Sequence, residues 1–195
     1  MKEFFDEEQH KYFVNGIEVP SVTEIAEPIS FNRLNNLPNH ILERARIRGS
    51  KVHELAEEYL LTGETDWNEI EPEFAGYFEQ FILWVRTYRP KVLYTEYRMF
   101  CPYFAGTCDL ICEIDKKIVL IDYKTTSAVD KKSLSVQLEG YKRLCKLHNI
   151  KIDECCYLHL KKDGYVFKPI ETNPRWFDIL LEHNMFMKEK LDGRK

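Results

Sequence analysis

The sequence has no long hydrophobic run. Its longest apolar stretches are short segments such as residues 81–85 (FILWV), whereas a helix that spans a membrane needs about 20 apolar residues. The first ten residues, MKEFFDEEQH, are acidic and lack the apolar segment of a secretory signal peptide. These features predict a cytoplasmic protein without a membrane partner.

An excess of positive charge is also missing. Lysine and arginine together number 28 and aspartate and glutamate 32, which gives a formal net charge of −4. Proteins that coat nucleic acid non-specifically are strongly basic, so this class is excluded, while a local basic groove is not. With 44% hydrophobic and 31% charged residues, the 195-residue chain has the composition and length of one domain with a sizeable core.

The six cysteines lack the C-x-x-C spacing of many metal sites. Most of them lie in apolar segments, and without a secretory signal a disulfide framework is not expected. The alternative is a zinc or iron–sulfur cluster, for which Cys108-x-x-x-Cys112 is the nearest candidate, because both thiols would share one face of a strand. We therefore expect reduced core cysteines and no iron–sulfur cluster.

The hydrophobic pattern changes between helical and strand periods along the chain. Period-two alternation bounded by turn residues predicts strands over 11–15, 17–19, 91–100, 104–113, 117–123, 155–160 and 165–170. Helical spacing predicts helices over 39–62, with a break allowed near Gly49, and over 73–88, 133–148 and 174–190. A capping-box spacing at Ser21 and Glu24 starts a further short helix. This order predicts an α/β fold with a central mixed β-sheet flanked by helices.

The segment 118–124 is the most informative part of the sequence. Residues 118–121 (IVLI) are apolar at four consecutive positions, as in a central strand buried on both faces. Asp122 and Lys124 follow at once and share one face of the strand. Two charges at the end of an apolar strand are costly to bury unless they pair or coordinate an ion. The residues alone therefore indicate either a metal site or a structural ion pair.

A second carboxylate lies in apolar surroundings on the preceding strand. Asp109 stands between Cys108 and Leu110, and a hairpin turned at residues 115–116 would bring it near Asp122. Two close carboxylates repel each other, and a divalent cation relieves that repulsion. The pair therefore favours a metal site at this end of the hairpin.

Two further polar residues lie on helical faces that otherwise look buried. His53 is in line with the small residue Gly49 on the first long helix, and Gln137 lies one turn before Tyr141 on the third. Taken alone, each is more often a hydrogen-bonded core residue than part of a site.

Together these residues resemble a known family. The ordered motifs are Gly49-x-x-x-His53, Gly106-Thr-Cys-Asp109, Ile121-Asp122-Tyr-Lys124-Thr and Gln137-x-x-x-Tyr141. They resemble the PD-(D/E)XK nuclease superfamily and, more narrowly, its RecB-like exonuclease branch. The opening residues 12–23 (YFVNGIEVPSVT) resemble phage-type members of that branch. The resemblance implies a restriction-endonuclease-like core and a metal-dependent DNA exonuclease of DNA recombination, repair or phage DNA processing.

The same resemblance implies one nuclease domain over residues 1–195. Its N-terminal hairpin and short helix would occupy residues 1–30, the catalytic core residues 39–160, and a C-terminal strand and helix residues 165–195.

The resemblance also assigns catalytic and metal-binding roles. It implies that Asp109 and Asp122 are catalytic acids and metal ligands, joined in binding the metal by His53 and the main-chain carbonyl of Tyr123. Oxygen ligands suit Mg²⁺, and one imidazole makes Mn²⁺ a good substitute. Lys124 would be the catalytic cation that positions the attacking water or neutralises charge on the phosphate.

Five further residues are expected to support this centre or to contact DNA: Glu96, Gln137, Tyr141, Arg48 and Thr125. The implied substrate is double- or single-stranded DNA that has an end, in a bacterial or phage-infected cell. No G-x-x-x-x-G-K-[ST] motif occurs, so ATP-driven translocation is excluded. Processivity would need either a homo-oligomer or a recombination or single-strand-binding partner. The remaining alternatives are a structure- or sequence-selective endonuclease of the same fold and a non-catalytic DNA-binding subunit.

Overall fold

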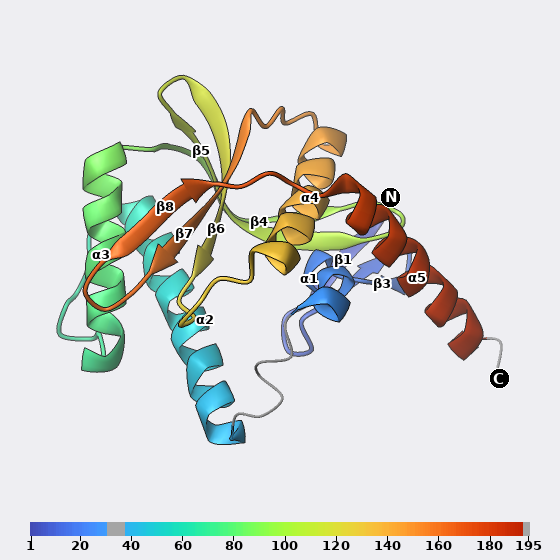
Figure 1. Ribbon diagram of the computed structural model, residues 1–195, viewed down its shortest axis with the longest axis horizontal. Coiled ribbons are helices and arrows are strands. Elements are labelled where there is room, and N and C mark those ends of the chain that lie inside the picture. The colour runs from blue at the N-terminus through green and yellow to red at the C-terminus, as the bar shows by residue number, and fades with distance from the viewer. Residues whose placement is uncertain (31–37, 193–195) are drawn as a thin grey trace.

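A computed structural model describes residues 1–30 and 38–192 of the chain (Figure 1). The strands are β1 (Glu3–Asp6), β2 (Lys11–Val14), β3 (Ile17–Val19), β4 (Lys91–Phe100), β5 (Ala105–Ile114), β6 (Lys117–Lys124), β7 (Glu154–Leu160) and β8 (Tyr165–Pro169). The helices are α1 (Val22–Ala26), α2 (Asn39–Thr62), α3 (Pro72–Tyr88), α4 (Lys131–Leu147) and α5 (Pro174–Asp192), with a 3₁₀ turn at Glu27–Ile29. No described helix is both long and apolar enough to span a membrane.

The central sheet has five strands in the order β4-β5-β6-β7-β8. All neighbours pair antiparallel except β6 and β7, which are parallel. Parallel neighbours need a crossover connection, and α4 supplies it. The prediction of an α/β fold with a mixed sheet flanked by helices is confirmed.

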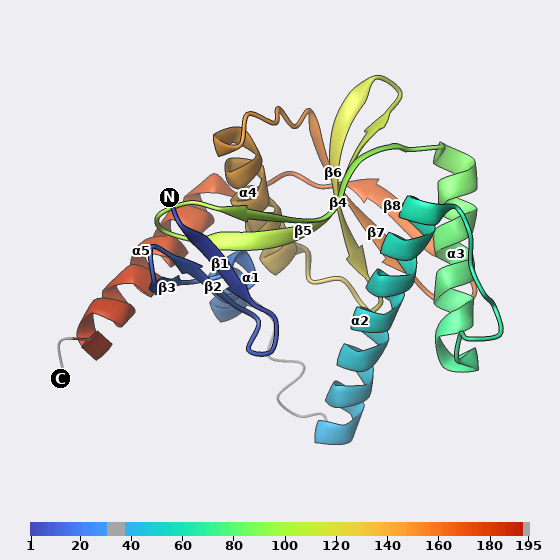
Figure 2. The same cartoon turned by 180° about the vertical axis from the view of Figure 1, so that it is seen from behind.

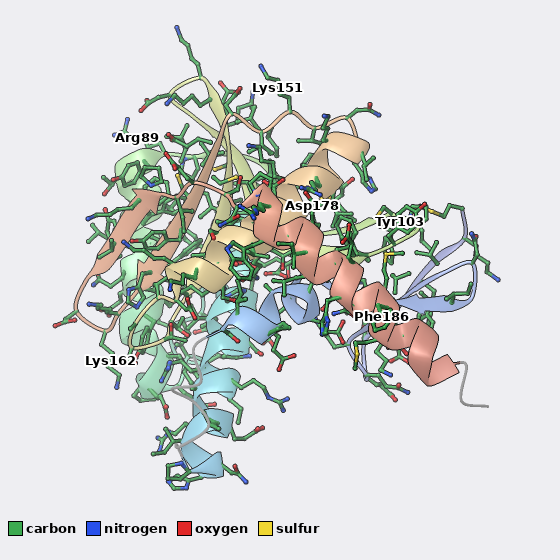
Figure 3. All side chains as sticks on the ribbon, turned by 45° about the vertical axis from the view of Figure 1, so that its right-hand side comes forward. Arg89, Tyr103, Lys151, Lys162, Asp178 and Phe186 are labelled. Carbon is green, nitrogen blue, oxygen red and sulfur yellow. The ribbon has the colours of Figure 1, made fainter. Side chains whose placement is uncertain are left out.

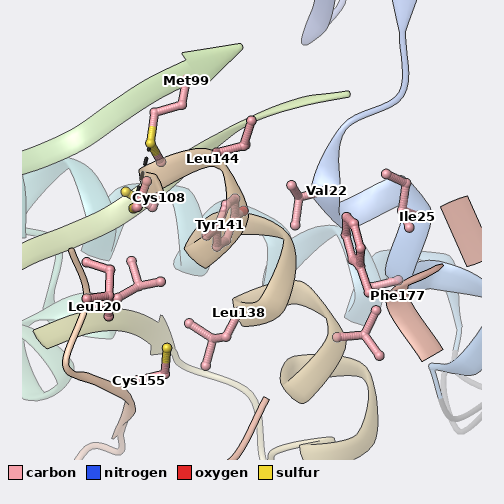
Figure 4. Close-up of a cluster of buried hydrophobic side chains, with 14 of the residues drawn as sticks. Val22, Ile25, Met99, Cys108, Leu120, Leu138, Tyr141, Leu144, Cys155 and Phe177 are labelled. Carbon is pink, nitrogen blue, oxygen red and sulfur yellow. Dashed lines mark hydrogen bonds between the residues drawn. The ribbon is translucent and has the colours of Figure 1, made fainter. Parts of the chain in front are cut away.

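Two hydrophobic cores cover the two faces of this sheet. On one face lie α1, α4 and α5, whose buried side chains include Val22, Leu138 and Phe177 (Figure 4). On the other face lie α2 and α3, which contribute Val52 and Phe78. Figures 1 and 2 show the two groups of helices from opposite sides of the sheet. The sheet is therefore the middle layer of three, and its interior strands read as apolar because neither face meets water.

Helix α5 crosses the outside of α4 and is joined to it by one ion pair, between Arg143 and Asp178. Arg143 on α4 pairs with Glu139 one turn earlier and with Asp178 on α5 (Figure 3). Its guanidinium also lies 4.8 Å from the ring centroid of Phe177. Most of this charge is near the surface, so the buried ring contributes more than the ion pairs to holding α5 in place.

A second sheet of three strands, β1-β2-β3, packs against the far ends of β4 and β5 (Figure 2). The hydroxyl of Tyr12 lies 2.8 Å from Thr107 Oγ1, and the N–H of Ala105 donates to the carbonyl of Pro20 at 3.0 Å. The hairpin of β2 and β3 was predicted, but β1 was not. Strand β1 has only four residues, with a charged residue at each end, so its sequence shows too little apolar alternation to predict an edge strand.

Two expectations about local structure differ from the observed fold. Helix α2 runs unbroken through Gly49 for 24 residues and ends at Gly63, whose φ of 74° suits glycine. The prediction that Cys108 and Cys112 share one face is wrong, because they lie in the two opposite cores. Alternation along β5 is interrupted between Cys108 and Leu110, which lie in opposite cores although they are two residues apart.

Close packing at Gly140 on α4 gives a test of the core. A β-carbon there would lie 2.6 Å from Phe177 Cε2 and 2.8 Å from Val22 Cγ1, both fully buried. We expect Gly140→Ala to lower the free energy of unfolding by about 1–3 kcal/mol, since overpacking outweighs the helix propensity of alanine. Gly49→Ala is the matched control, because its new β-carbon would meet only Thr125 Oγ1 at 3.8 Å. Urea unfolding that ranked the two variants equal would contradict this packing.

Candidate functional site

A cleft with a volume of about 1040 Å³ lies between α2, the β1–β3 sheet and strands β4–β6. Seven of the residues predicted for the site line it together: His53, Glu96, Asp109, Asp122, Lys124, Gln137 and Tyr141. They come from α2, from three neighbouring strands and from α4. The cleft thus collects polar groups from segments up to about half the chain apart.

The most compact group in the cleft consists of His53, Glu96 and Asp109. His53 Nδ1 lies 3.4 Å from Glu96 Oε1 and 3.5 Å from Asp109 Oδ1. One ligand atom from each residue lies within 4.8 Å of the others. An imidazole nitrogen and two carboxylate oxygens at this separation form a donor set for a divalent cation.

Glu96 reaches this group through an unusual backbone conformation. Its φ is 43°, in the left-handed region, although it lies within β4. For a non-glycine residue this conformation costs roughly 1–3 kcal/mol, and within a strand, away from turns, it is a feature of functional sites. Among the described residues, Glu96 Oε1 is buried and accepts no well-directed hydrogen bond. A strained residue whose buried carboxylate oxygen faces the imidazole of His53 at 3.4 Å fits a cation ligand.

Asp109 is held by the neighbouring strand. Its Oδ2 accepts a hydrogen bond of 2.6 Å from the N–H of Tyr123 on β6, and its other oxygen faces His53. The ring of Tyr123 packs edge-on against the imidazole at 5.4 Å between centroids. Tyr123 therefore orients both the carboxylate and the imidazole of the group.

Asp122 and Lys124 form a buried ion pair beside the group. Lys124 Nζ lies 2.7 Å from Asp122 Oδ2 and donates to Gln137 Oε1 at 3.3 Å. Gln137 Nε2 in turn donates to the hydroxyl of Tyr141 at 3.2 Å. Beneath Tyr141, Gly106 leaves room for the ring, because a β-carbon there would lie 2.8 Å from Tyr141 Cε1. Helix α4 thus fixes the ammonium group of Lys124 at the edge of the cleft.

The pKa values express the crowding of charges in the cleft. Burial raises the pKa of Asp109, and it raises the pKa of Asp122 to about 6 against the effect of Lys124. Burial lowers the pKa of His53, but Asp109 and Glu96 more than offset this and raise it to about 9. The carboxylates therefore favour a positive charge between them, as a cation site requires.

The compact group differs from the predicted ligand set at Glu96 and at Asp122. Glu96 was expected outside the direct ligands, yet its carboxylate contacts His53 as closely as Asp109 does. Asp122 was expected among the ligands, and its nearest charged partner is Lys124. The sequence could not predict that Glu96 lies next to His53, because the alternation of side chains along β4 is interrupted at Glu96 itself.

Two predicted DNA contacts lie outside the cleft lining. The guanidinium of Arg48 lies 5.2 Å from the ring centroid of Tyr77 on α3. Thr125 is buried beside Gly49 of α2. Arg44, one turn before Arg48 on α2, also has a partner, because its Nε donates a hydrogen bond to Glu73 Oε1 at 2.8 Å. The basic stretch before His53 therefore makes contacts within the chain, both to α3 and within α2.

Sequence reasoning missed the N-terminal wall of the cleft. This wall includes Phe5, Glu7, His10, Tyr12, Thr23 and Arg98. Thr23 hydrogen-bonds to Tyr141 and so extends the series of contacts that begins at Lys124. A signal was present for Arg98, which follows Glu96 by two residues on the same strand and would share its face.

No protein-family model and no curated protein matches the sequence. A crystal structure of the protein SSO0001 is 15% identical over 74% of this chain and 70% of its own, with a TM-score of 0.39. A crystal structure of a phage-related exonuclease from Haemophilus somnus 129PT is 13% identical over 83% of this chain and 88% of its own, with a TM-score of 0.44. At these low values neither structure bears on the activity of this chain.

Cation binding by the group can be tested with Mn²⁺. We expect Glu96→Gln to reduce Mn²⁺ affinity by about tenfold or more, since a neutral amide replaces a carboxylate ligand. Glu113→Gln is the matched control, because Glu113 lies on β5 outside the cleft and pairs with Lys91. Isothermal titration calorimetry should detect the loss only in the first variant. Equal affinities would exclude Glu96 from the ligand set.

Proposed function

We propose that this chain is a metal-dependent deoxyribonuclease that hydrolyses phosphodiester bonds from a DNA end. The observation that carries the proposal is the group His53, Glu96 and Asp109 within reach of the buried Lys124–Asp122 pair, in one open cleft. Such a group beside a fixed ammonium is suited to a negatively charged substrate whose charge increases during reaction. The motif resemblance to RecB-like exonucleases supports the same activity.

The proposal includes Mg²⁺ or Mn²⁺ as the cation. His53, Glu96 and Asp109 would hold it. Asp122 and the main-chain carbonyl of Tyr123 are further candidate ligands. When bound, it supplies Lewis acidity toward a phosphate oxygen and the attacking water. The buried Glu96 Oε1 and the mixed nitrogen and oxygen donors support this assignment.

The remaining chemistry belongs to the chain's own side chains. Burial lowers the pKa of Lys124, but Asp122 and Asp109 offset this and raise it, so the group stays charged. Its Nζ is held by two acceptors, Asp122 and Gln137. A fixed ammonium can neutralise charge that develops on the phosphate or can orient water without first reorganising. Gln137 and Tyr141 are positioning residues that limit its movement.

The setting included in this proposal is DNA recombination, repair or phage DNA processing. Residues 1–195 would act as one nuclease domain, either as a homo-oligomer or with a recombination or single-strand-binding partner. The endonuclease alternative keeps the same site and differs in accepting DNA without an end.

Lys124→Ala tests the proposed chemistry. We expect it to reduce cleavage of linear DNA by about 100-fold or more, because it removes a charge that acts on the transition state, while Mn²⁺ still binds. Lys117→Ala is the matched control, since Lys117 lies at the other end of β6 and pairs with Glu154. The thermal stability of both variants should be measured as well. Lys124→Ala leaves the carboxylate of Asp122 buried without its cation, which can destabilise the fold.

The substrates should be end-labelled linear duplex, single-stranded and closed-circular DNA, each with Mg²⁺ or Mn²⁺. Loss of linear DNA alone is the result expected of an exonuclease, and nicking of circles would identify an endonuclease. Cleavage that persists in a folded Lys124→Ala protein would refute the proposed site. Absence of cleavage by the wild type despite bound metal would point to a DNA-binding subunit.

A further inference from the structure

The wall of the cleft opposite α2 combines aromatic rings with one arginine. The rings of Phe5 and Tyr12 lie 4.7 Å apart, and His10 meets Phe5 edge-on at 5.1 Å. The guanidinium of Arg98 lies 4.4 Å from the ring centroid of Phe5. All four residues line the same cleft as the metal-binding group. Their side chains are not required for any step of the proposed hydrolysis.

Arg98 is distinctive in charge as well as in place. Among the described residues that line the cleft, Arg98 and Lys124 are the only lysine or arginine side chains, and Lys124 is paired with buried Asp122. Arg98 pairs with Glu7 at 3.1 Å, and both side chains are largely exposed. Such exposed pairs contribute little and exchange readily. Arg98 can therefore release Glu7 and bind an anion.

The wall stands at a fixed offset from the metal-binding group. Arg98 is two residues beyond Glu96 on β4 and lies opposite Thr107, which is two residues before Asp109 on β5. Two residues of strand span roughly 7 Å, a distance that one nucleotide of an extended DNA strand can cover. The Tyr12–Thr107 contact of 2.8 Å fixes the N-terminal sheet at this offset.

The exposed part of the wall suits a base. His10 is exposed and Phe5 half-buried, and both line the cleft, where the guanidinium of Arg98 lies over the ring of Phe5. His10 has a φ of 53°, and the turn between β1 and β2 holds it in this left-handed conformation. Aromatic faces stack on any unpaired base, while guanidinium groups bind the adjoining phosphate. A paired base inside a duplex offers no such free face.

We infer that Phe5, His10 and Arg98 form a nucleotide subsite that binds an unpaired nucleotide of a DNA strand about one nucleotide from the scissile phosphate. The inference rests on the proposed nuclease function and extends it to the substrate class, a DNA end with a single-stranded overhang. His10 and Phe5 stack on the base, and Arg98 binds its phosphate. Tyr12 holds the wall in place through Thr107.

The test is binding of three labelled DNAs to the full chain, measured by fluorescence anisotropy with Ca²⁺ in place of Mg²⁺. The DNAs are a duplex with a short overhang, the same duplex with an abasic overhang, and a blunt duplex. We expect His10→Ala and Phe5→Leu each to weaken binding of the base-bearing overhang by about tenfold and to leave the other two DNAs unchanged.

Arg98→Ala should weaken binding of both overhangs and reduce the salt slope of log Kd by about one. Lys91→Ala is the matched control, because Lys91 lies on the same strand, pairs with Glu113 and is outside the cleft. The subsite is refuted if the His10 and Phe5 variants affect the base-bearing and abasic overhangs equally. It is also refuted if Arg98→Ala has no larger effect than Lys91→Ala.

Failure of the subsite and failure of the nuclease proposal give different results. If the overhang binds as expected but no DNA is cleaved with Mg²⁺ or Mn²⁺, the subsite stands and the nuclease proposal fails. If cleavage depends on Lys124 while the subsite variants bind all three DNAs normally, the nuclease proposal stands and the subsite fails. A thermal unfolding curve of each variant should be recorded as a control, to check that the variant still folds.

Discussion

The burial of like charges on the neighbouring strands β4–β6 is the constraint on which the rest of the structure depends. Glu96, Asp109 and Asp122 are brought together where the core would otherwise exclude them, and burial raises the pKa of both aspartates. Hydrogen bonds from Tyr123 and the ammonium group of Lys124 offset part of that cost. The three layers of the fold hold these groups in place against their mutual repulsion.

Apolar strands and amphipathic helices could be predicted because burial sets a regular period. The strand over residues 118–121 and its charged end were evident from four consecutive apolar residues followed by Asp122 and Lys124. The helices packed on the sheet followed from their apolar spacing for the same reason. These regular elements were sufficient to predict the mixed sheet and the nearness of Asp109 to Asp122, whereas the motif resemblance was needed to bring His53, Gln137 and Tyr141 to the same site.

Features set by local irregularity or by distant contacts could not be predicted. The left-handed backbone of Glu96 breaks the alternation from which a face is assigned, so its place beside His53 and Asp109 was not visible. The spacing of Cys108 and Cys112 likewise gave no sign that they lie in opposite cores. The N-terminal wall depends on a contact between Tyr12 and Thr107. Short strands with charged ends carry no signal for such docking.

That contact spans 95 residues of sequence, and Val22 of α1 packs near Phe177 on α5. The contact of Tyr12 therefore depends on β5, and that of Val22 depends on α5, both far along the chain. Contacts of such long sequence separation form late in folding. The cleft is thus assembled only when segments distant in sequence have come together, and the entropy cost of closing these long loops is a cost of bringing its acidic residues side by side.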